Sequence, residues 1–206
     1  TKDVLDRAAA LQSVGVDIVT LDSAHGHSKG VIEALKLLKK NFKNLPVIAG
    51  NVATSGGALA LANAGADAVK IGIGPGSICT TRIVAGAGVP QLTAIMEAAK
   101  ALKGKNIPII ADGGIKTTGD MVKCLAGGAD FVMLGSYLAG TDEAPGRVHT
   151  DEQGNKYKKY VGMASKEAQS QWRGNGRSVE GVSHQVNYKG SVLDILDEIA
   201  INIKSG

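Results

Sequence analysis

Amphipathic stretches alternate with short apolar runs from the start of the chain to about residue 140. Five stretches repeat apolar side chains at the spacing of an α-helix: residues 4–13, 30–41, 57–63, 91–103 and 119–126. The runs between them are rich in Val, Ile and Ala, as buried strands are: residues 15–22, 45–50, 65–72, 107–114 and 128–135. Apolar strands separated by helices predict an α/β fold with a parallel sheet and helical crossovers.

Three of the apolar runs share one beginning, a glycine followed two residues later by an aspartate. The copies are Gly15-Val16-Asp17, Gly65-Ala66-Asp67 and Gly128-Ala129-Asp130, each directly after a helical stretch. Glycine at this place fits the left-handed residue that ends a helix. The repeat therefore predicts three equivalent helix-to-strand connections.

Each predicted strand ends in Gly or Asp and is followed by a polar loop. In parallel α/β sheets, and above all in (β/α)₈ barrels, ligands bind at these carboxyl ends. The loops Asp112-Gly113-Gly114 and Gly135-Ser136 follow the last two strands, where barrel enzymes commonly bind phosphate. Glycine makes up 28 of the 206 residues, about twice its usual share. Much of it lies in these loops, which predicts close approach of the backbone to a ligand.

Cys79 follows a loop with glycine at every second position, Gly72, Gly74 and Gly76. A lone cysteine is more often a small apolar core residue, which is the expectation for Cys124 in its helical stretch. The glycine loop can turn its N–H groups or carbonyls towards an ion, and a thiolate is a strong nucleophile. We therefore select Cys79 as the candidate nucleophile. The glycine spacing is not the Gly-x-Gly-x-x-Gly fingerprint, which excludes a Rossmann site.

The chain becomes polar after Gly140, and residues 141–190 are predicted to form a hairpin, at 148–160, and a flap beside the active site. A last amphipathic helix is predicted at residues 192–203. The net charge is +4, but Lys and Arg are scattered, so no nucleic-acid partner is expected. No apolar stretch approaches the roughly 20 residues that span a bilayer, so no membrane partner is expected. Two isolated cysteines and no leader-like start predict a reducing, cytoplasmic setting.

Residues 72–82 (GIGPGSICTTR), followed by 86–91 (GAGVPQ), resemble the signature of the IMP dehydrogenase/GMP reductase family. Residues 22–28, 49–52, 111–115 and Tyr160-x-Gly162-Met163 resemble its other motifs, in the family's order. The resemblance runs nearly end to end. It implies a single catalytic (β/α)₈ barrel domain over residues 1–206, of which about five C-terminal βα units are present and the N-terminal strands are missing, because five strands cannot close an eight-stranded barrel.

The resemblance also implies an activity and a site. The substrate would be a purine nucleoside monophosphate (GMP or IMP), the cofactor NADPH or NAD, and the full-length protein a homotetramer. Cys79 matches the nucleophile that attacks purine C2 to form a thioimidate, with Thr81 and Glu180 as catalytic partners. The matching substrate-binding residues are Ser77, Asp112, Gly113, Gly114, Gly135, Ser136, Tyr160, Gly162 and Met163. Asp22, Ser23, Asn51 and Gly72 match the cofactor side, and the carbonyls of Gly74, Gly76 and Cys79 match a potassium loop.

The family contains two reactions, and the flap favours one of them. Dehydrogenases hydrolyse the thioimidate with an Arg-Tyr pair on a long flap, whereas here only residues 166–179 separate Ser165 from Glu180 and they contain no Arg-Tyr. Thr81 and Glu180 match the pair with which reductases handle ammonia, so we favour a GMP reductase. Residues 83–86 and 89–91 look more like dehydrogenases, so IMP dehydrogenase remains the alternative. A phosphate-binding barrel fragment without catalysis is the alternative from another class.

Overall fold

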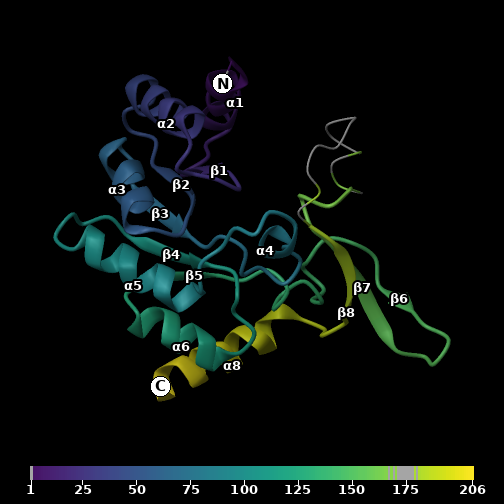
Figure 1. The fold of residues 1–206 in the computed structure, drawn as a ribbon. Coiled ribbons are helices and arrows are strands. Elements are labelled where there is room, and N and C mark those ends of the chain that lie inside the picture. Colours follow the sequence, from purple (N-terminus) through teal and green to yellow (C-terminus); the bar gives the residue numbers. More distant parts are fainter. Residues whose placement is uncertain (1, 167, 169, 171–178, 180) are drawn as a thin grey trace. The chain divides into compact units, whose positions relative to one another are not determined.

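The computed structural model describes residues 2–166, 168, 170, 179 and 181–206 (Figure 1). The chain divides into two compact units. The first consists of Thr1–Ile73, Val89–Asp112 and Cys124–Val132, and the second of Gly74–Gly88, Gly113–Lys123 and Met133–Gly206.

A five-stranded sheet forms the centre of the first unit, in the order β1-β2-β3-β4-β5. The strands are β1 (Val19–Asp22), β2 (Val47–Val52), β3 (Ala68–Ile71), β4 (Ile109–Asp112) and β5 (Phe131–Met133). The pairs from β1 to β4 are parallel, with Val19 opposite Val47 and Val69 opposite Ile109. The predicted α/β fold with a parallel sheet is confirmed, and within the described residues β1 and β5 are open edges, so the barrel is not closed.

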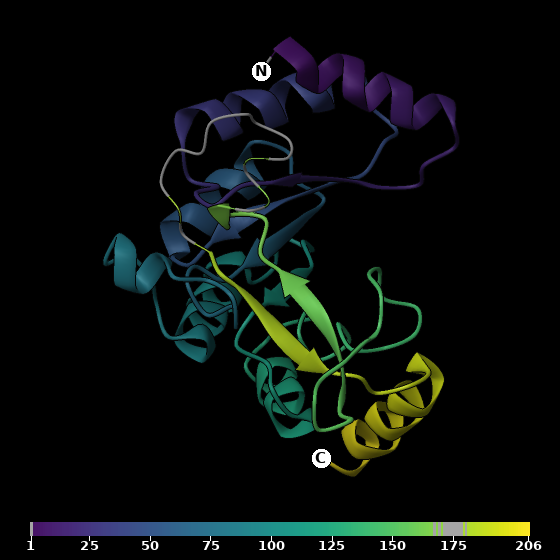
Figure 2. The ribbon, with the colours of Figure 1, turned by 90° about the vertical axis from the view of Figure 1, so that its right-hand side faces the viewer.

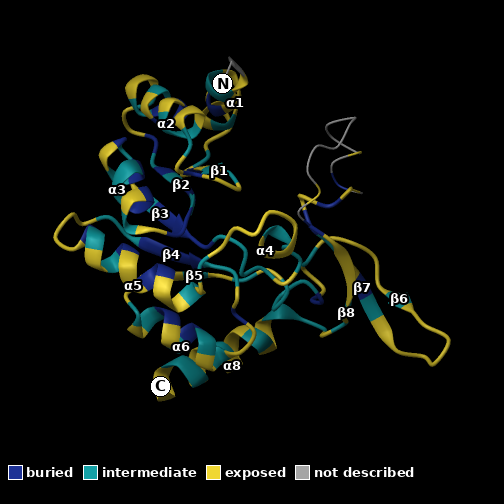
Figure 3. Ribbon diagram, viewed as in Figure 1, coloured by how far each residue is buried: buried dark blue, intermediate teal, exposed yellow. Residues whose placement is uncertain are grey.

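Helices precede and follow the strands as the pattern predicted: α1 (Lys2–Ser13), α2 (Lys29–Asn41), α3 (Ser55–Asn63), α5 (Gln91–Leu102) and α6 (Thr118–Ala126). In the first unit α3 packs against α5, and both contact β3. Leu61, Val69 and Ile95 are fully buried between them, and Figure 3 shows this region of β3 and β4 in the buried colour. Burial of these aliphatic side chains stabilises the sheet with its helices.

The two copies of the glycine-aspartate repeat that follow a described strand, at 65–67 and 128–130, bind that preceding strand in the same way. Gly15, Gly65 and Gly128 have φ of 82°, 101° and 106°, the left-handed conformation expected at a helix end. Asp67 Oδ2 accepts from Val47 N at 2.7 Å, while Asp67 N donates to Val47 O at 2.9 Å. Asp130 repeats both bonds with Ile109, at 2.8 and 2.9 Å. The repeated aspartate therefore fixes where the preceding strand begins.

The second unit contains a three-stranded antiparallel sheet, β6 (His149–Thr150), β7 (Lys156–Val161) and β8 (Ser183–Asn187) (Figure 2). The predicted hairpin is confirmed, and its turn is held by Asp151, whose side chain accepts from Asn155. The side-chain hydrogen bond from Asn155 is the main reason why the pKa of Asp151 is lowered. The sequence pattern did not predict β8 or the short helix α4 (Thr81–Val84).

The loop before the hairpin connects this sheet to the last helix, α8 (Val192–Ser205). Lys158 is 2% exposed, and its ammonium donates to the carbonyls of Thr141 and Ala144 at 2.7 and 2.5 Å. In the same loop Glu143 Oε2 accepts from Val192 N at 2.8 Å, at the start of α8. Among the described helices none is both long and apolar enough to cross a membrane.

Candidate functional site

The residues selected from the sequence fall into two groups, each within one compact unit. The first group lies at the carboxyl ends of the parallel strands: Asp22, Ser23, Asn51, Gly72 and Asp112. The second lies in the other unit: Gly74, Gly76, Ser77, Cys79, Thr81, Gly113, Gly114, Gly135, Ser136, Tyr160, Gly162 and Met163. Glu180 lies outside the described residues.

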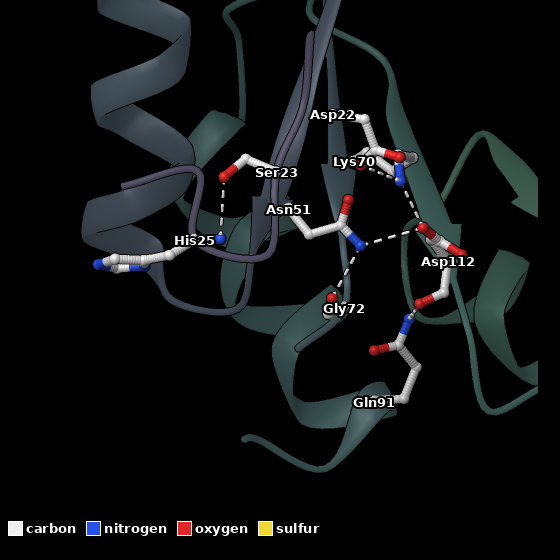
Figure 4. A network of polar contacts seen from close by, with 8 residues as sticks. All are labelled: Asp22, Ser23, His25, Asn51, Lys70, Gly72, Gln91 and Asp112. Carbon is white, nitrogen blue, oxygen red and sulfur yellow. Dashed lines mark hydrogen bonds and ion pairs between the residues drawn. The ribbon is translucent and has the colours of Figure 1, made fainter. Parts of the chain in front are cut away.

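Three side chains of the first group, those of Asp22, Asn51 and Asp112, gather near a lysine that the sequence motifs did not single out (Figure 4). Lys70, on β3, is 3% exposed. Its Nζ lies 3.1 Å from Asp22 Oδ1, at the end of β1, and 2.5 Å from Asp112 Oδ2, at the end of β4. Asn51 Nδ2 also donates to Asp112 Oδ2, at 3.0 Å. We call Asp22, Asn51, Lys70 and Asp112 the strand-end cluster.

Two glycines allow the strand ends to approach closely enough for this cluster. A Cβ on Gly50 would lie 2.7 Å from Lys70 Cβ and 2.8 Å from Lys70 O. A Cβ on Gly72, whose φ is 148°, would lie 2.0 Å from Asp112 O. Gln91, at the start of α5, joins β3 to β4 because its Nε2 donates to Ile71 O and Asp112 O at 2.9 and 3.1 Å. The spacing of the strand ends is therefore set by backbone contacts that leave no room for side chains.

The strand-end cluster retains hydrogen-bonding capacity for a ligand. Asn51 Nδ2 donates to Gly72 O, at 2.8 Å, and to Asp112 Oδ2. In contrast, Asn51 Oδ1 is buried and has no hydrogen-bond partner among the described residues. A buried acceptor without a donor is rare in proteins. The carboxamide N–H of a nicotinamide is a donor of the kind that Asn51 Oδ1 lacks, so this site fits the cofactor that the resemblance implied. Ser23 binds the end of β2 through its backbone. Its N–H donates to Gly50 O at 2.9 Å, and its carbonyl accepts from Asn51 N at 2.7 Å.

Cys79 lies in a loop of the second unit that is held at both ends. Its Sγ lies 3.2 Å from Thr81 Oγ1, and its N–H donates to Gly76 O at 3.1 Å. The neighbouring Ile78 O accepts from Val182 N at 3.0 Å, and Cys79 forms an isolated β-bridge with Gly181. The thiol is half-buried. A cysteine on a turn fixed in this way, beside a hydroxyl, has the surroundings of a positioned nucleophile.

Glycine also brings other predicted substrate-binding residues of this unit together. A Cβ on Gly113 would lie 3.0 Å from Gly76 N, so the two loops touch through their backbones. A Cβ on Gly135 would lie within 2.4 Å of Tyr160 Oη. Gly162 packs against Ile78, with 3.2 Å from its would-be Cβ to Ile78 Cδ1. We call Gly113, Gly135, Tyr160 and Gly162 the predicted phosphate cradle, because glycine loops can direct backbone N–H groups at an anion.

The remaining predicted residues of the second unit lie on its surface or partly below it. Ser77, Gly114 and Met163 are exposed, with Met163 at 68%, and Ser136 is half-buried. Exposed positions can contact a ligand without rearrangement. The predicted potassium loop keeps its glycines, but Gly76 O already accepts from Cys79 N, which leaves it one lone pair for a cation.

Sequence reasoning missed Lys70 and Gln91, although one signal pointed to each. Lys70 interrupts the apolar run Ala68-Val69-Lys70-Ile71, and a lysine inside a buried strand needs anionic partners. Gln91 stands in the family-like GAGVPQ motif but carried no assigned role.

Comparisons with known proteins agree on one family. A family model described as the IMP dehydrogenase / GMP reductase domain matches residues 1–206. Inosine-5'-monophosphate dehydrogenase of Aquifex aeolicus is 54% identical over 214 residues, which cover 100% of this chain and 44% of that protein. The enzyme of the same name from Escherichia coli K12 is 48% identical, covering 94% of this chain and 41% of the relative.

A solved structure with the same fold carries the other activity of the family in its name. A GMP reductase variant from Trypanosoma brucei, solved in complex with guanosine 5'-monophosphate, has a TM-score of 0.95 and 44% sequence identity. The match covers 100% of this chain and 44% of that one. The chain thus spans less than half the length of the relatives that it matches.

Proposed function

Because the chain belongs to the IMP dehydrogenase/GMP reductase family, we propose that its protein is a nicotinamide-dependent oxidoreductase of purine nucleoside monophosphates, and specifically a GMP reductase. The observation that carries the proposal is the placement of Cys79 on a fixed turn, 3.2 Å from the Thr81 hydroxyl. A thiol held in this way can attack the same ring carbon in every substrate molecule, because the entropy cost of ordering its loop is not paid again at each turnover.

The proposed reaction follows from the chemistry of Cys79. Attack of Sγ on C2 of GMP forms a C–S bond, and loss of the 2-amino group as ammonia leaves a thioimidate. Thr81 Oγ1, next to Sγ, is placed to exchange a proton with the sulfur or the departing amine. When bound, the reduced nicotinamide supplies the hydride that C2 gains. The C2–S bond then breaks with its electron pair returning to sulfur, IMP is released, and the Cys79 thiolate takes up a proton.

The two groups of residues have separate tasks in this proposal. By the family resemblance, the predicted phosphate cradle would hold the phosphate and Asp112 would accept from the ribose hydroxyls. Asp22, Ser23, Asn51 and Gly72 would hold the nicotinamide half of the cofactor, and the unpartnered Asn51 Oδ1 would be available to accept from its carboxamide. A potassium ion would bind to the carbonyls of Gly74, Gly76 and Cys79 and stiffen the nucleophile's loop.

The reductase is preferred over the dehydrogenase because of the step that separates them. Hydrolysis of the thioimidate requires an activated water, and the short segment 166–179 contains no Arg-Tyr pair to activate one. IMP dehydrogenase is the second candidate, because curated relatives with 48–54% identity carry that name. It would oxidise IMP with NAD and water to XMP.

Parallel assays of the natural full-length protein separate these candidates. With GMP and NADPH, the reductase predicts loss of NADPH absorbance and formation of equal amounts of IMP and ammonia. With IMP and NAD, the dehydrogenase predicts XMP. XMP formation without GMP-dependent NADPH oxidation would overturn the reductase proposal, and nucleotide binding without either reaction would indicate a non-catalytic barrel.

The two cysteines provide a matched pair of variants for the same assays. Cys79→Ala should lower kcat by about a thousandfold or more, because the covalent step is lost. Cys124→Ala, at a buried position of α6, should leave kcat within about twofold of the wild type, since this residue has no role in the proposed reaction. Activity that survives Cys79→Ala would exclude the thioimidate route.

A further inference from the structure

Lys70 is a buried charge whose two ion-pair partners both lie in the first unit. It is 3% exposed, whereas its partners Asp112 and Asp22 are 26% and 67% exposed. An isolated ammonium in this position would be strongly destabilising, and two carboxylates compensate for it. Two carboxylates against one ammonium leave the strand-end cluster with a net negative charge.

The ammonium contacts one oxygen of each carboxylate and leaves the other available. Asp112 Oδ2 accepts hydrogen bonds from Lys70 Nζ, at 2.5 Å, and from Asn51 Nδ2, at 3.0 Å. Asp22 Oδ1 accepts a hydrogen bond from Lys70 Nζ at 3.1 Å. Asp112 Oδ1 and Asp22 Oδ2 have no donor among the hydrogen bonds of the described residues. A carboxylate held by one oxygen has a fixed plane, so its second oxygen presents its lone pairs in a fixed direction.

We propose that Lys70 is a positioning residue that couples the nucleotide site to the cofactor site. It does so by holding Asp112, on the ribose side, and Asp22, on the nicotinamide side, from a single buried ammonium. The inference rests on the proposed function only for the ligands assigned to Asp112 and Asp22. The contacts of Lys70 itself come from the strand-end cluster.

The coupling has a direction that follows from charge. Lys70 shares its charge between two carboxylates, so a change at one alters the charge that it offers to the other. Neutralising Asp22 leaves Asp112 as the main counter-ion of Lys70. Asp112 then accepts less strongly from a ribose hydroxyl, and the nucleotide site becomes less selective for ribose although no residue that touches the ribose has changed.

Equilibrium binding of nucleotides with and without ribose hydroxyls tests this without requiring turnover. We would measure Kd for GMP, 2′-deoxy-GMP and 3′-deoxy-GMP on the natural full-length protein. The wild type should prefer GMP to at least one deoxy analogue by about fivefold or more, the value of one hydrogen bond to a charged acceptor. Lys70→Met should reduce that preference to about twofold or less, and Lys70→Arg should retain most of it because the charge remains.

The coupling is tested by a variant on the cofactor side. Asp22→Asn, at a largely exposed side chain, should lower the ribose preference by about two- to threefold through Lys70. The matched control is Lys39→Met. Lys39 Nζ also pairs with an aspartate, Asp67 Oδ2, at 2.6 Å. Asp67 lies at the amino ends of the strands, whereas the strand-end cluster lies at their carboxyl ends. That variant should lower stability and leave the ribose preference unchanged.

Each outcome bears on the proposal. A folded Lys70→Met protein with the wild-type ribose preference would overturn the positioning role, and an unchanged preference in Asp22→Asn would overturn the coupling. If Lys70→Met does not fold, Lys70→Arg and Asp22→Asn still provide the comparison. A wild type without any ribose preference would overturn the role of Asp112 and the inference with it. If the wild type does not turn over GMP but the variants change the ribose preference as predicted, the reductase proposal is contradicted and the role of Lys70 is supported.

Discussion

Gly135 and Tyr160 show how a single missing side chain shapes the predicted phosphate cradle. A Cβ on Gly135 would lie 2.4 Å from Tyr160 Oη but 3.5 Å from Tyr160 Cζ. The obstacle is therefore the hydroxyl and not the ring. We predict that Gly135→Ala lowers the free energy of unfolding by about 1–3 kcal/mol, because Tyr160 must move. Urea denaturation measures this change.

A double-mutant cycle identifies the contact responsible. In a Tyr160→Phe background the same Gly135→Ala change should be at least about 1 kcal/mol less destabilising, because the hydroxyl is gone. Gly119→Ala in α6 is the control: its Cβ would meet nothing nearer than Thr117 Oγ1 at 3.7 Å. Equal losses for Gly135→Ala in both backgrounds would show that this hydroxyl does not set the requirement for glycine.

At the level of single residues, the sequence predicts chemistry better than contacts. Cys79, Asp112 and the strand-end glycines could be selected because their types and spacing are unusual. Lys70 was missed, because the apolar residues around it indicate only a strand, and its partners are 48 and 42 residues away in the sequence. Contacts at that separation depend on the register of β1, β3 and β4, which a strand pattern does not specify.

At the level of elements, the repeated aspartates join consecutive strands by hydrogen bonds. Asp67 and Asp130 each exchange two hydrogen bonds with the first residue of the preceding strand. We predict that Asp67→Ala and Asp130→Ala each destabilise the protein by about 1–3 kcal/mol, because a buried backbone N–H loses its acceptor. Chemical denaturation checks this against Asp6→Ala, an exposed aspartate of α1, which should change stability by no more than about 0.5 kcal/mol.

Asparagine variants test the reason for that loss. Asp130→Asn keeps a side-chain carbonyl that can accept from Ile109 N, so it should recover at least half of the stability lost in Asp130→Ala. No recovery would indicate that the negative charge, and not the accepted hydrogen bond, gives this aspartate its role.

The attachment of α8 should depend on pH. The pKa of Glu143 is lowered, first by the hydrogen bond from Val192 N at the start of α8. A lowered folded-state pKa means that the ionised carboxylate stabilises the fold above its unfolded-state pKa, and that this contribution is lost as pH falls through the folded-state value. Between about pH 6 and about pH 3, the wild type should therefore lose stability more steeply than Glu143→Gln, which accepts the same bond without titrating. Parallel slopes in urea denaturation would contradict this role.

The elements themselves were largely predictable, and the exceptions have one cause. Helix and strand positions in the first unit follow periodicity, and left-handed Gly15, Gly65 and Gly128 end helices as expected. In contrast, β8 and α4 have no periodicity of their own. β8 is a strand because β7 pairs with it, from Tyr157 opposite Asn187 to Val161 opposite Ser183, and such a tertiary partner is not visible locally.

For the molecule as a whole, the family and the parallel sheet could be predicted from sequence, because signature motifs follow one another in order along it. The family model covers residues 1–206. What the motifs could not settle is the choice between two reactions that share the same nucleophile. In the proposed mechanism, that choice depends on whether hydride or water reacts with the thioimidate, and therefore on groups around Cys79 rather than on the fold.

The proposed reaction requires a covalent bond between Cys79 and purine C2 during turnover, and acid-quenched mass spectrometry of the full-length protein detects such a bond. During turnover of GMP with NADPH, we predict a nucleotide adduct on the peptide that contains Cys79. The adduct should be absent from Cys79→Ala and unchanged in Cys124→Ala. Steady turnover with no adduct on Cys79, or an adduct on another residue, would contradict the account.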